Sequence, residues 1–302
     1  MKVMTKRLKA FFLKAFLTFV DTKRLKKQNY PVDDLVIVKD IPYVQDGNPL
    51  HRLDILSQKE GFMNMPTIIN IHGGGLIYGD KELNQNFNAE FARRGFQVIS
   101  LSYRLLPNCT FDEQVQDILD ALSFIRNQSQ TYSINLNKVF MTGDSAGGLL
   151  TLFAVALSQS EKLRNLFNVK DPKIDIKGMG LISTMLDIKE RNDIIDYAPI
   201  LVLQGKDHLA SDYIYEPSKL FEEVVFPSCW MNTSAEDFIH TDTLKLKQLF
   251  EQNKVRHELL DWGKGDAYRL DHVFPVTYPK YQESQKTIDA MIDFFNTVKQ
   301  VL

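Results

Sequence analysis

Short, uninterrupted apolar runs recur along the chain from about residue 35 onward. One of them, TIINI at Thr67–Ile71, lacks the polar alternation of a strand with one face in water. Such runs suit a parallel sheet whose two faces are both covered by helices. The expected strands are Leu35–Val38, Arg52–Leu56, Thr67–Ile71, Gln97–Ser102, Val139–Thr142, Met179–Ile182, Cys229–Asn232 and His257–Leu260.

Segments with helical spacing alternate with these runs. They predict helices at Asn84–Arg94, Asp112–Arg126, Ala146–Leu157, Thr243–Asn253 and Tyr281–Val298. Alternation of strands and helices predicts one doubly wound α/β domain over residues 1–302. Residues 187–226 interrupt the alternation, and we interpret them as an insertion.

Residues 1–28 form a separate basic, amphipathic segment. They hold nine Lys or Arg and one Asp, a net charge of +8, whereas the whole chain has −2 and the remainder therefore −10. A signal peptide or a membrane span is a poor match, because Lys14 interrupts the short apolar stretch and no small-residue cleavage site follows. The apolar residues at helical spacing are Leu8, Phe12, Ala15, Phe16 and Phe19.

Two arrangements of this segment stay open. The helix could pack on the protein over the mouth of an active site, with its Phe and Leu face inward and its lysines in water, or it could lie in a membrane surface. We expect the first and keep peripheral membrane contact through residues 1–28 as the alternative.

Composition narrows the class of protein. Hydrophobic residues make up 44% and charged residues 25%, as in ordinary globular proteins. The sequence pI of about 6.3 gives no reason to expect nucleic-acid binding. The two cysteines, Cys109 and Cys229, form no CxxC pair or disulfide framework, which favours a reducing compartment, and we expect the cytoplasm.

A serine motif follows one of the predicted strands. Residues 142–148 read TGDSAGG, which matches G-x-S-x-G with Ser145 at its centre, between a strand and a helix. A serine nucleophile has to stand exposed on such a sharp turn, with small residues on both sides. The same letters also occur in ordinary turns, but the strand before and the helix after favour a nucleophile.

A glycine-rich loop follows an earlier strand. HGGG at residues 72–75 can turn successive backbone N–H groups toward one point, as an oxyanion hole requires. A phosphate-binding loop would instead need Gly-Lys-Ser/Thr, and here the chain continues Leu76-Ile77-Tyr78. HGGG and G-x-S-x-G, about seventy residues apart, together indicate a serine nucleophile with an oxyanion hole more specifically than either motif alone.

The base is sought among six histidines, His51, His72, His208, His240, His257 and His272. The chain order nucleophile, acid, histidine excludes those that precede Ser145. His257 begins a predicted strand, so we assign it a structural role. His272 lies in the loop before the last helix and is the predicted base.

Two aspartates compete as the acid of a catalytic triad. Asp207 follows the run ILVLQGK, and Asp237 ends the run CWMNTSAED. The acid should be separated from His272 by one helix and one strand, which holds for Asp237, whereas Asp207 would add the strand Cys229–Asn232. Asp237 is therefore the predicted acid, Glu236 is a neighbouring alternative, and Asp207 belongs to the insertion as a turn residue.

At these residues the chain resembles the hormone-sensitive-lipase-like carboxylesterases of the α/β-hydrolase fold. The matching segments are HGGGLIYGDK (72–81), LSYRLLPNCTFDEQVQDILDAL (101–122), TGDSAGG (142–148), SAED (234–237) and DHVF (271–274). The family has Ala-Pro-Glu where this chain has Leu106-Pro107-Asn108.

The resemblance implies an eight-stranded, mostly parallel sheet with a helical cap, here formed by about residues 1–34 and 187–226. It implies that Gly74, Gly75 and Ala146 donate to the oxyanion. It also implies hydrolysis of short- to medium-chain carboxylic esters, as small-molecule substrates, without a metal or an organic cofactor. The alternatives are an amidase or peptidase that uses the same triad, or a non-catalytic ligand-binding protein of this fold.

Overall fold

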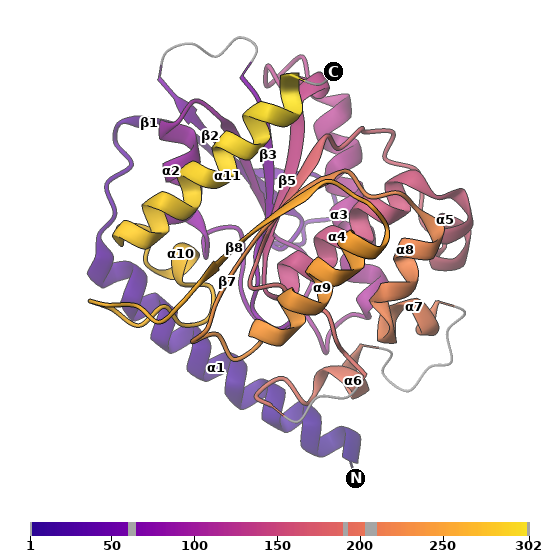
Figure 1. The fold of residues 1–302 in the computed structure, drawn as a ribbon. Helices are drawn as coiled ribbons and strands as arrows, with labels where there is room; N and C mark the ends of the chain where they lie inside the picture. The colour runs from indigo at the N-terminus through magenta and orange to yellow at the C-terminus, as the bar shows by residue number, and fades with distance from the viewer. Residues whose placement is uncertain (1, 60–64, 190–192, 203–209, 301–302) are drawn as a thin grey trace.

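A single mixed sheet forms the centre of the protein (Figure 1). The computed structural model describes residues 2–59, 65–189, 193–202 and 210–300. The strand order is β1-β2-β4-β3-β5-β6-β7-β8. The strands are β1 (Leu35–Pro42), β2 (Arg52–Gln58), β3 (Thr67–Ile71), β4 (Gln97–Leu101), β5 (Val139–Asp144), β6 (Gly178–Ile182), β7 (Ser228–Ser234) and β8 (His257–Trp262).

Seven of the eight strands in this sheet point in the same direction, and β2 is the reversed one. β2 pairs antiparallel with β1 and with β4, while every other pair from β4 to β8 is parallel. In β3, Ile69 lies between Ile99 and Met141, and all five residues of that strand are buried. The predicted α/β-hydrolase sheet of eight, mostly parallel strands is confirmed.

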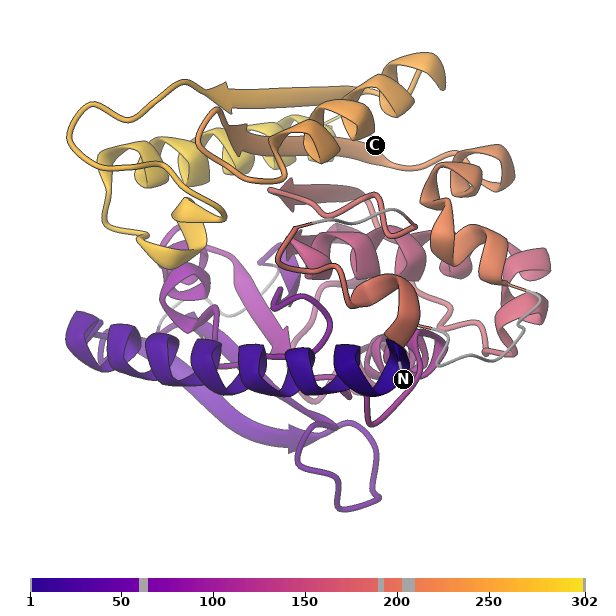
Figure 2. The ribbon, with the colours of Figure 1, turned by 90° about the horizontal axis from the view of Figure 1, so that it is seen from below.

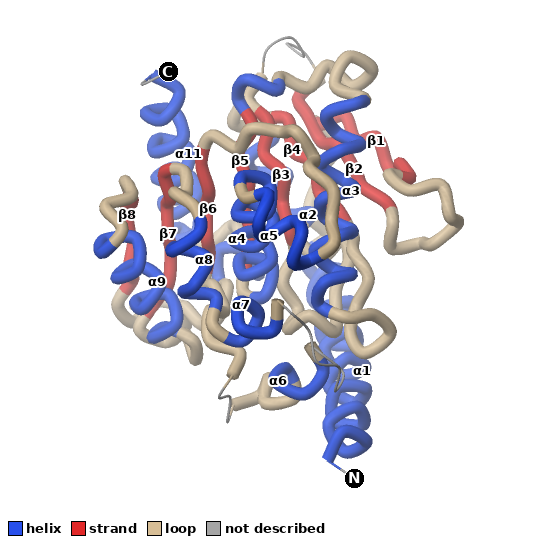
Figure 3. The backbone as a smooth tube through the Cα atoms, turned by 90° about the vertical axis from the view of Figure 1, so that its right-hand side faces the viewer, coloured by secondary structure: helices blue, strands red, loops and turns tan. Residues whose placement is uncertain are grey.

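Helices cover both faces of the sheet (Figures 1 and 3). One apolar core joins the sheet to helices that include α3 and α4, and a second core joins its other face to α2 and α11. Uninterrupted apolar strands are thus explained by two buried faces. These helices are α2 (Gln85–Arg93), α3 (Phe111–Asn127), α4 (Ala146–Gln159), α5 (Glu161–Phe167), α9 (His240–Gln252), α10 (Phe274–Thr277) and α11 (Gln282–Gln300).

The five predicted helices are all present with shifted ends. The largest shift is in α9, which begins three residues before the predicted start at Thr243. The short helices α5 and α10 were not predicted, because four to seven residues contain too little periodicity to distinguish a helix from a loop. Within the described ranges, none of the helices is both long and apolar enough to cross a membrane.

The basic N-terminal segment is one long helix, α1 (Lys2–Gln28), which lies across one end of the molecule (Figure 2). Its inner face is the row that contains Ala10, Leu13 and Leu17, which pack on the core. The predicted inward orientation of the Phe-rich face is wrong. Phe12 and Phe16 point to solvent with 62% exposure each, because the shorter aliphatic residues fill the contact with the body.

Among its described residues, the segment between β6 and β7 carries four short helices. They are α6 (Ala198–Leu201), η2 (Pro217–Lys219), α7 (Ser211–Tyr215) and α8 (Leu220–Glu223). Ile200 and Leu201, which begin the apolar run, lie in α6, and α6 lies near the N-terminal half of α1 (Figure 2). Asp207 and His208 lie outside the described residues. The assignment of 1–34 and 187–226 as a cap stays a prediction.

Candidate active site

Ser145 occupies a strained turn between β5 and α4. Its backbone has φ 52° and ψ −120°, in the left-handed half of conformational space that non-glycine residues rarely adopt. The turn is possible because glycines flank it. A Cβ on Gly143 would lie 2.4 Å from the carbonyl oxygen of Gly147, and one on Gly147 would lie 2.1 Å from that of Ile71. This is the strand-turn-helix geometry that exposes a nucleophilic side chain.

Three side chains from distant parts of the sequence form one hydrogen-bonded chain. Ser145 Oγ lies 2.9 Å from His272 Nε2, and His272 Nδ1 lies 2.8 Å from Asp237 Oδ1. Asp237 follows β7, and His272 lies in the loop between β8 and α10. These are the three residues that the sequence predicts for the triad.

The Asp237 carboxylate is buried and held in a fixed orientation. Its Oδ1 accepts a hydrogen bond from the Ile239 amide at 3.0 Å, and its Oδ2 lies 3.4 Å from the hydroxyl of Thr233. Burial raises the pKa of this carboxyl, but the hydrogen bond and charge of His272 outweigh burial, so the pKa lies below its usual value. The group is therefore an anion that accepts the Nδ1–H of the imidazole.

The neighbouring Glu236 has different partners. Its Oε2 accepts hydrogen bonds from the amides of Leu270 at 2.7 Å and Gly265 at 3.2 Å. These two backbone bonds hold the pKa of the Glu236 carboxyl below its usual value. Glu236 thus fastens the loop that carries His272, and Asp237 is the carboxylate that meets the imidazole.

The HGGG loop turns beside the serine. Gly74 and Gly75 have φ of +107° and +59°, and a Cβ on Gly74 would lie 2.1 Å from the carbonyl oxygen of Tyr78. Both glycines line the same cavity as Ser145. Within the described ranges, the amide N–H groups of Gly74, Gly75 and Ala146 have no protein acceptor. An oxygen atom bound next to Ser145 could therefore accept hydrogen bonds from them.

Asp144 ties this loop to the serine turn, a role that the sequence did not indicate. Its Oδ1 accepts from the amide of Gly73 at 3.1 Å and from the side chain of Asn84 at 2.6 Å. Burial raises the pKa of the Asp144 carboxyl to about 6, against the lowering effect of the Asn84 hydrogen bond. Asp144 lies at least 60 residues from both partners in the sequence, so only the folded structure shows this role.

Three other histidines of the described structure contact groups outside the Ser145–His272–Asp237 chain. His72 stacks on Tyr103, with 4.3 Å between ring centroids, and burial lowers its pKa to about 4. His257 Nδ1 lies 2.8 Å from the carbonyl oxygen of Val255. His240 Nε2 lies 3.0 Å from the carboxylate of Asp261.

A cavity of about 190 Å³ opens over the serine. Besides the triad serine and histidine, its apolar wall includes Leu13 and Leu17 from α1 and Ile195 and Tyr197 from the segment between β6 and β7. The hydroxyl of Tyr197 donates to the carbonyl oxygen of Gly75 at 2.8 Å. The sequence offered no signal for the contacts of Ile195 and Tyr197, since the insertion has no recognisable motif.

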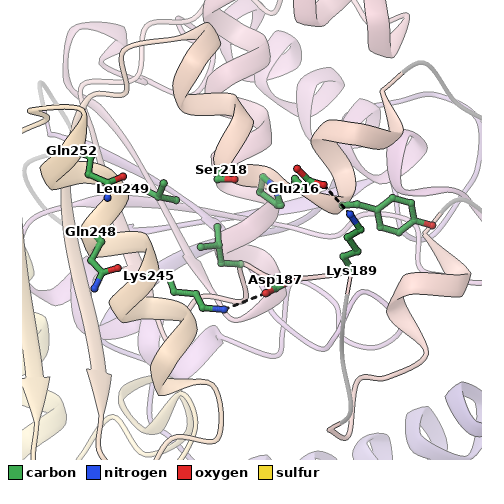
Figure 4. A pocket seen from close by; sticks show the side chains of 11 residues that line it. Asp187, Lys189, Glu216, Ser218, Lys245, Gln248, Leu249 and Gln252 are labelled. Atoms are coloured by element: carbon green, nitrogen blue, oxygen red, sulfur yellow. Dashed lines mark hydrogen bonds and ion pairs between the residues drawn. The ribbon is translucent and has the colours of Figure 1, made fainter.

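A larger hollow of about 430 Å³ lies away from the serine, between α9, η2 and the chain that follows β6 (Figure 4). Its lysines are paired: Lys189 contacts Glu216 at 3.0 Å and Lys245 contacts Asp187 at 3.2 Å. It contains none of the triad residues. We therefore place the candidate active site in the smaller cavity, which contains Ser145 and His272.

The sheet order, the strained serine turn and the Ser–His–Asp chain define an α/β-hydrolase. A family model described as BD-FAE matches residues 53–197. The acetyl esterase of Salmonella paratyphi A is 28% identical over 200 residues, which cover 62% of this chain and 60% of that protein, less than two thirds of its length. Over these segments the chain is similar to esterases of the α/β-hydrolase fold.

Solved structures agree with this fold. Esterase B from Lactobacillus rhamnosis, inhibited by a tributyrin phosphonate, is 26% identical, with 98% of this chain and 96% of that chain covered and a TM-score of 0.92. An esterase from Pyrobaculum calidifontis, at 18% identity and a TM-score of 0.72 over 97% of this chain and 93% of that one, shares the fold.

Proposed function

We propose that the protein is a serine carboxylesterase that hydrolyses short- to medium-chain esters. The observation that carries this proposal is the continuous chain from Ser145 Oγ through His272 to Asp237, with contacts of 2.9 and 2.8 Å. A nucleophile, a base and an orienting acid within hydrogen-bond reach are what acyl transfer through a serine requires.

In the first step, Ser145 Oγ attacks the ester carbonyl carbon while His272 Nε2 takes its proton. Asp237 holds Nδ1–H and stabilises the imidazolium. The imidazolium then gives its proton to the leaving alcohol, which produces an acyl-serine. Water, deprotonated by His272, attacks this ester and releases the carboxylic acid, so that Ser145 recovers its proton.

The negative charge on the carbonyl oxygen needs preorganised donors. We assign the amides of Gly74, Gly75 and Ala146 to this oxyanion hole. Support comes from their position around the serine and from the absence of protein acceptors for them within the described residues. Donors of this kind contribute most when they are fixed before the reaction, and the hydrogen bonds of Asp144 and Tyr197 to the loop provide that fixation.

The cavity supports the preference for shorter acyl groups. About 190 Å³ bounded by Leu13, Leu17, Ile195 and Val276 leaves limited room beyond the reacting carbonyl. The tributyrin phosphonate bound by esterase B is consistent with a butyryl-sized group. A series of nitrophenyl acetate, butyrate, octanoate and palmitate should therefore give the highest kcat/KM at the short end, and the matching anilides test amide cleavage. We also propose a cytoplasmic location.

Ser145→Ala tests the mechanism directly. The variant should lose ester hydrolysis by about 10⁴-fold or more, because the covalent route is removed, while its thermal unfolding stays close to that of the unaltered protein. An organophosphonate should label the unaltered protein once, at Ser145, as shown by peptide mass spectrometry. Hydrolysis by the variant at the original rate, or labelling elsewhere, would contradict the proposal.

A further inference from the structure

The outer face of α1 is an apolar strip within a basic frame. Four phenylalanines on it are between 58% and 65% exposed. Isolated exposed apolar residues are common, but a contiguous patch of aromatic side chains marks a surface that binds something. Its apolar members are Met4, Leu8, Phe11, Phe12, Phe16, Phe19 and Val20.

Polar contacts of the inner face hold the helix in this orientation. Lys6 and Lys9 both contact the carboxylate of Asp196, at 2.6 and 2.5 Å. Near the other end, Gln28 donates to the carbonyl oxygen of Thr277 at 2.7 Å. Rotation of α1 to bury its phenylalanines would break these contacts. The aromatic strip therefore faces outward in the structure.

Charge identifies the kind of partner. Residues 1–28 carry +8 in a chain whose remainder carries −10. Lys23, Lys26 and Lys27 are exposed beside the aromatic strip, and Lys23 Nζ lies 4.0 Å from the ring centroid of Phe19. A second copy packed face to face on this helix would bring two segments of +8 together, which disfavours a symmetric dimer. A partner that is apolar inside and anionic at its surface would complement both the exposed phenylalanines and the lysines beside them.

We propose that the outer face of α1 binds an anionic lipid surface. The phenylalanines enter the boundary between headgroups and acyl chains, and the lysines contact anionic headgroups, as in helices that lie in a membrane interface. Leu13 and Leu17, on the opposite face of the same helix, line the cavity above Ser145. Binding would therefore place the lipid about one helix diameter from that cavity, whatever reaction takes place in it.

Co-sedimentation with vesicles tests this proposal. The full-length protein should sediment with vesicles of phosphatidylcholine that contain phosphatidylglycerol, more weakly with phosphatidylcholine alone, and should be released by high salt. The triple variant Phe12→Gln, Phe16→Gln and Phe19→Gln should bind at least about tenfold more weakly, because the apolar contribution is lost. The control Val225→Gln changes an apolar side chain that is 79% exposed elsewhere and should bind normally.

Two further measurements make the outcome decisive. Circular dichroism should show that the triple variant keeps its helix content, and its hydrolysis of a soluble nitrophenyl butyrate should be unchanged, since none of the three side chains lines the cavity. Equal vesicle binding by the triple variant and the original protein would overturn the proposal. So would failure of the original protein to bind anionic vesicles, or light scattering that shows these phenylalanines hold two copies together instead.

Discussion

Asp237 and Glu236 are neighbours in sequence with different duties in space. The first contacts the imidazole of His272, and the second accepts from the backbone of the loop that carries it. A sequence pattern that places an acid after β7 cannot separate them, because adjacent side chains at a strand end differ only in direction. The structure supplies that direction.

Substitution of each carboxylate should separate the two roles. Asp237→Asn should lower kcat by about 10⁴-fold while the fold is kept, because the imidazole would be held in the wrong tautomer. Glu236→Gln retains an oxygen that can accept from the loop amides and should stay within about tenfold of the original kcat. Steady-state kinetics with nitrophenyl butyrate measures both. Comparable losses in the two variants would show that the acid acts only by holding the loop.

At the level of elements, two segments that are distant in sequence meet at the HGGG loop. Tyr197, from the segment between β6 and β7, donates to the carbonyl oxygen of Gly75, and Asp144 at the end of β5 accepts from Gly73. The loop that presents the proposed oxyanion donors is thus held at two points. Tyr197 is a positioning residue in this arrangement.

Tyr197→Phe should lower kcat by up to about tenfold with little change in KM, because one hydrogen bond contributes about 0.5–1.5 kcal/mol. Tyr215→Phe is the matched control. The hydroxyl of Tyr215 donates at 2.8 Å to Pro199 in the same segment, away from the glycine loop. Thermal unfolding should respond similarly in both variants, whereas kcat should respond only in the first. If Tyr197 had a purely structural role, Tyr197→Phe and Tyr215→Phe would show the same change in kcat as well as in thermal stability.

The elements show what a sequence can and cannot specify here. β3 and β5 were predictable because both of their faces are buried, so that apolar residues follow one another directly, as in Ile68-Ile69 and Val139-Phe140-Met141. The orientation of α1 was not predictable, because apolar residues occur on both sides of this helix. Leu13 and Leu17 pack inward while Phe12 and Phe16 face solvent, and only the shape and charge of the body select between these faces.

For the molecule as a whole, the active-site turn has a cost in stability. Asp144 is buried, and burial raises the pKa of its carboxyl from the ordinary value of 3.8 to about 6. Between these two values the folded chain holds a proton that the unfolded chain releases. The free energy of unfolding therefore falls as pH rises through this interval. A shift of this size corresponds to roughly 3 kcal/mol.

Asp144→Asn removes this titration while it keeps an oxygen that can accept from Gly73 and Asn84. The variant should gain stability relative to the original protein as pH rises from about 4 to 6, by up to roughly 3 kcal/mol, with a constant difference at higher pH. Urea unfolding of both proteins across this pH range measures the difference in their free energies of unfolding. The other titrating groups are the same in both proteins, so their contributions cancel in this difference. A difference that stays constant over the whole range would show that Asp144 ionises in the folded protein as easily as in the unfolded chain.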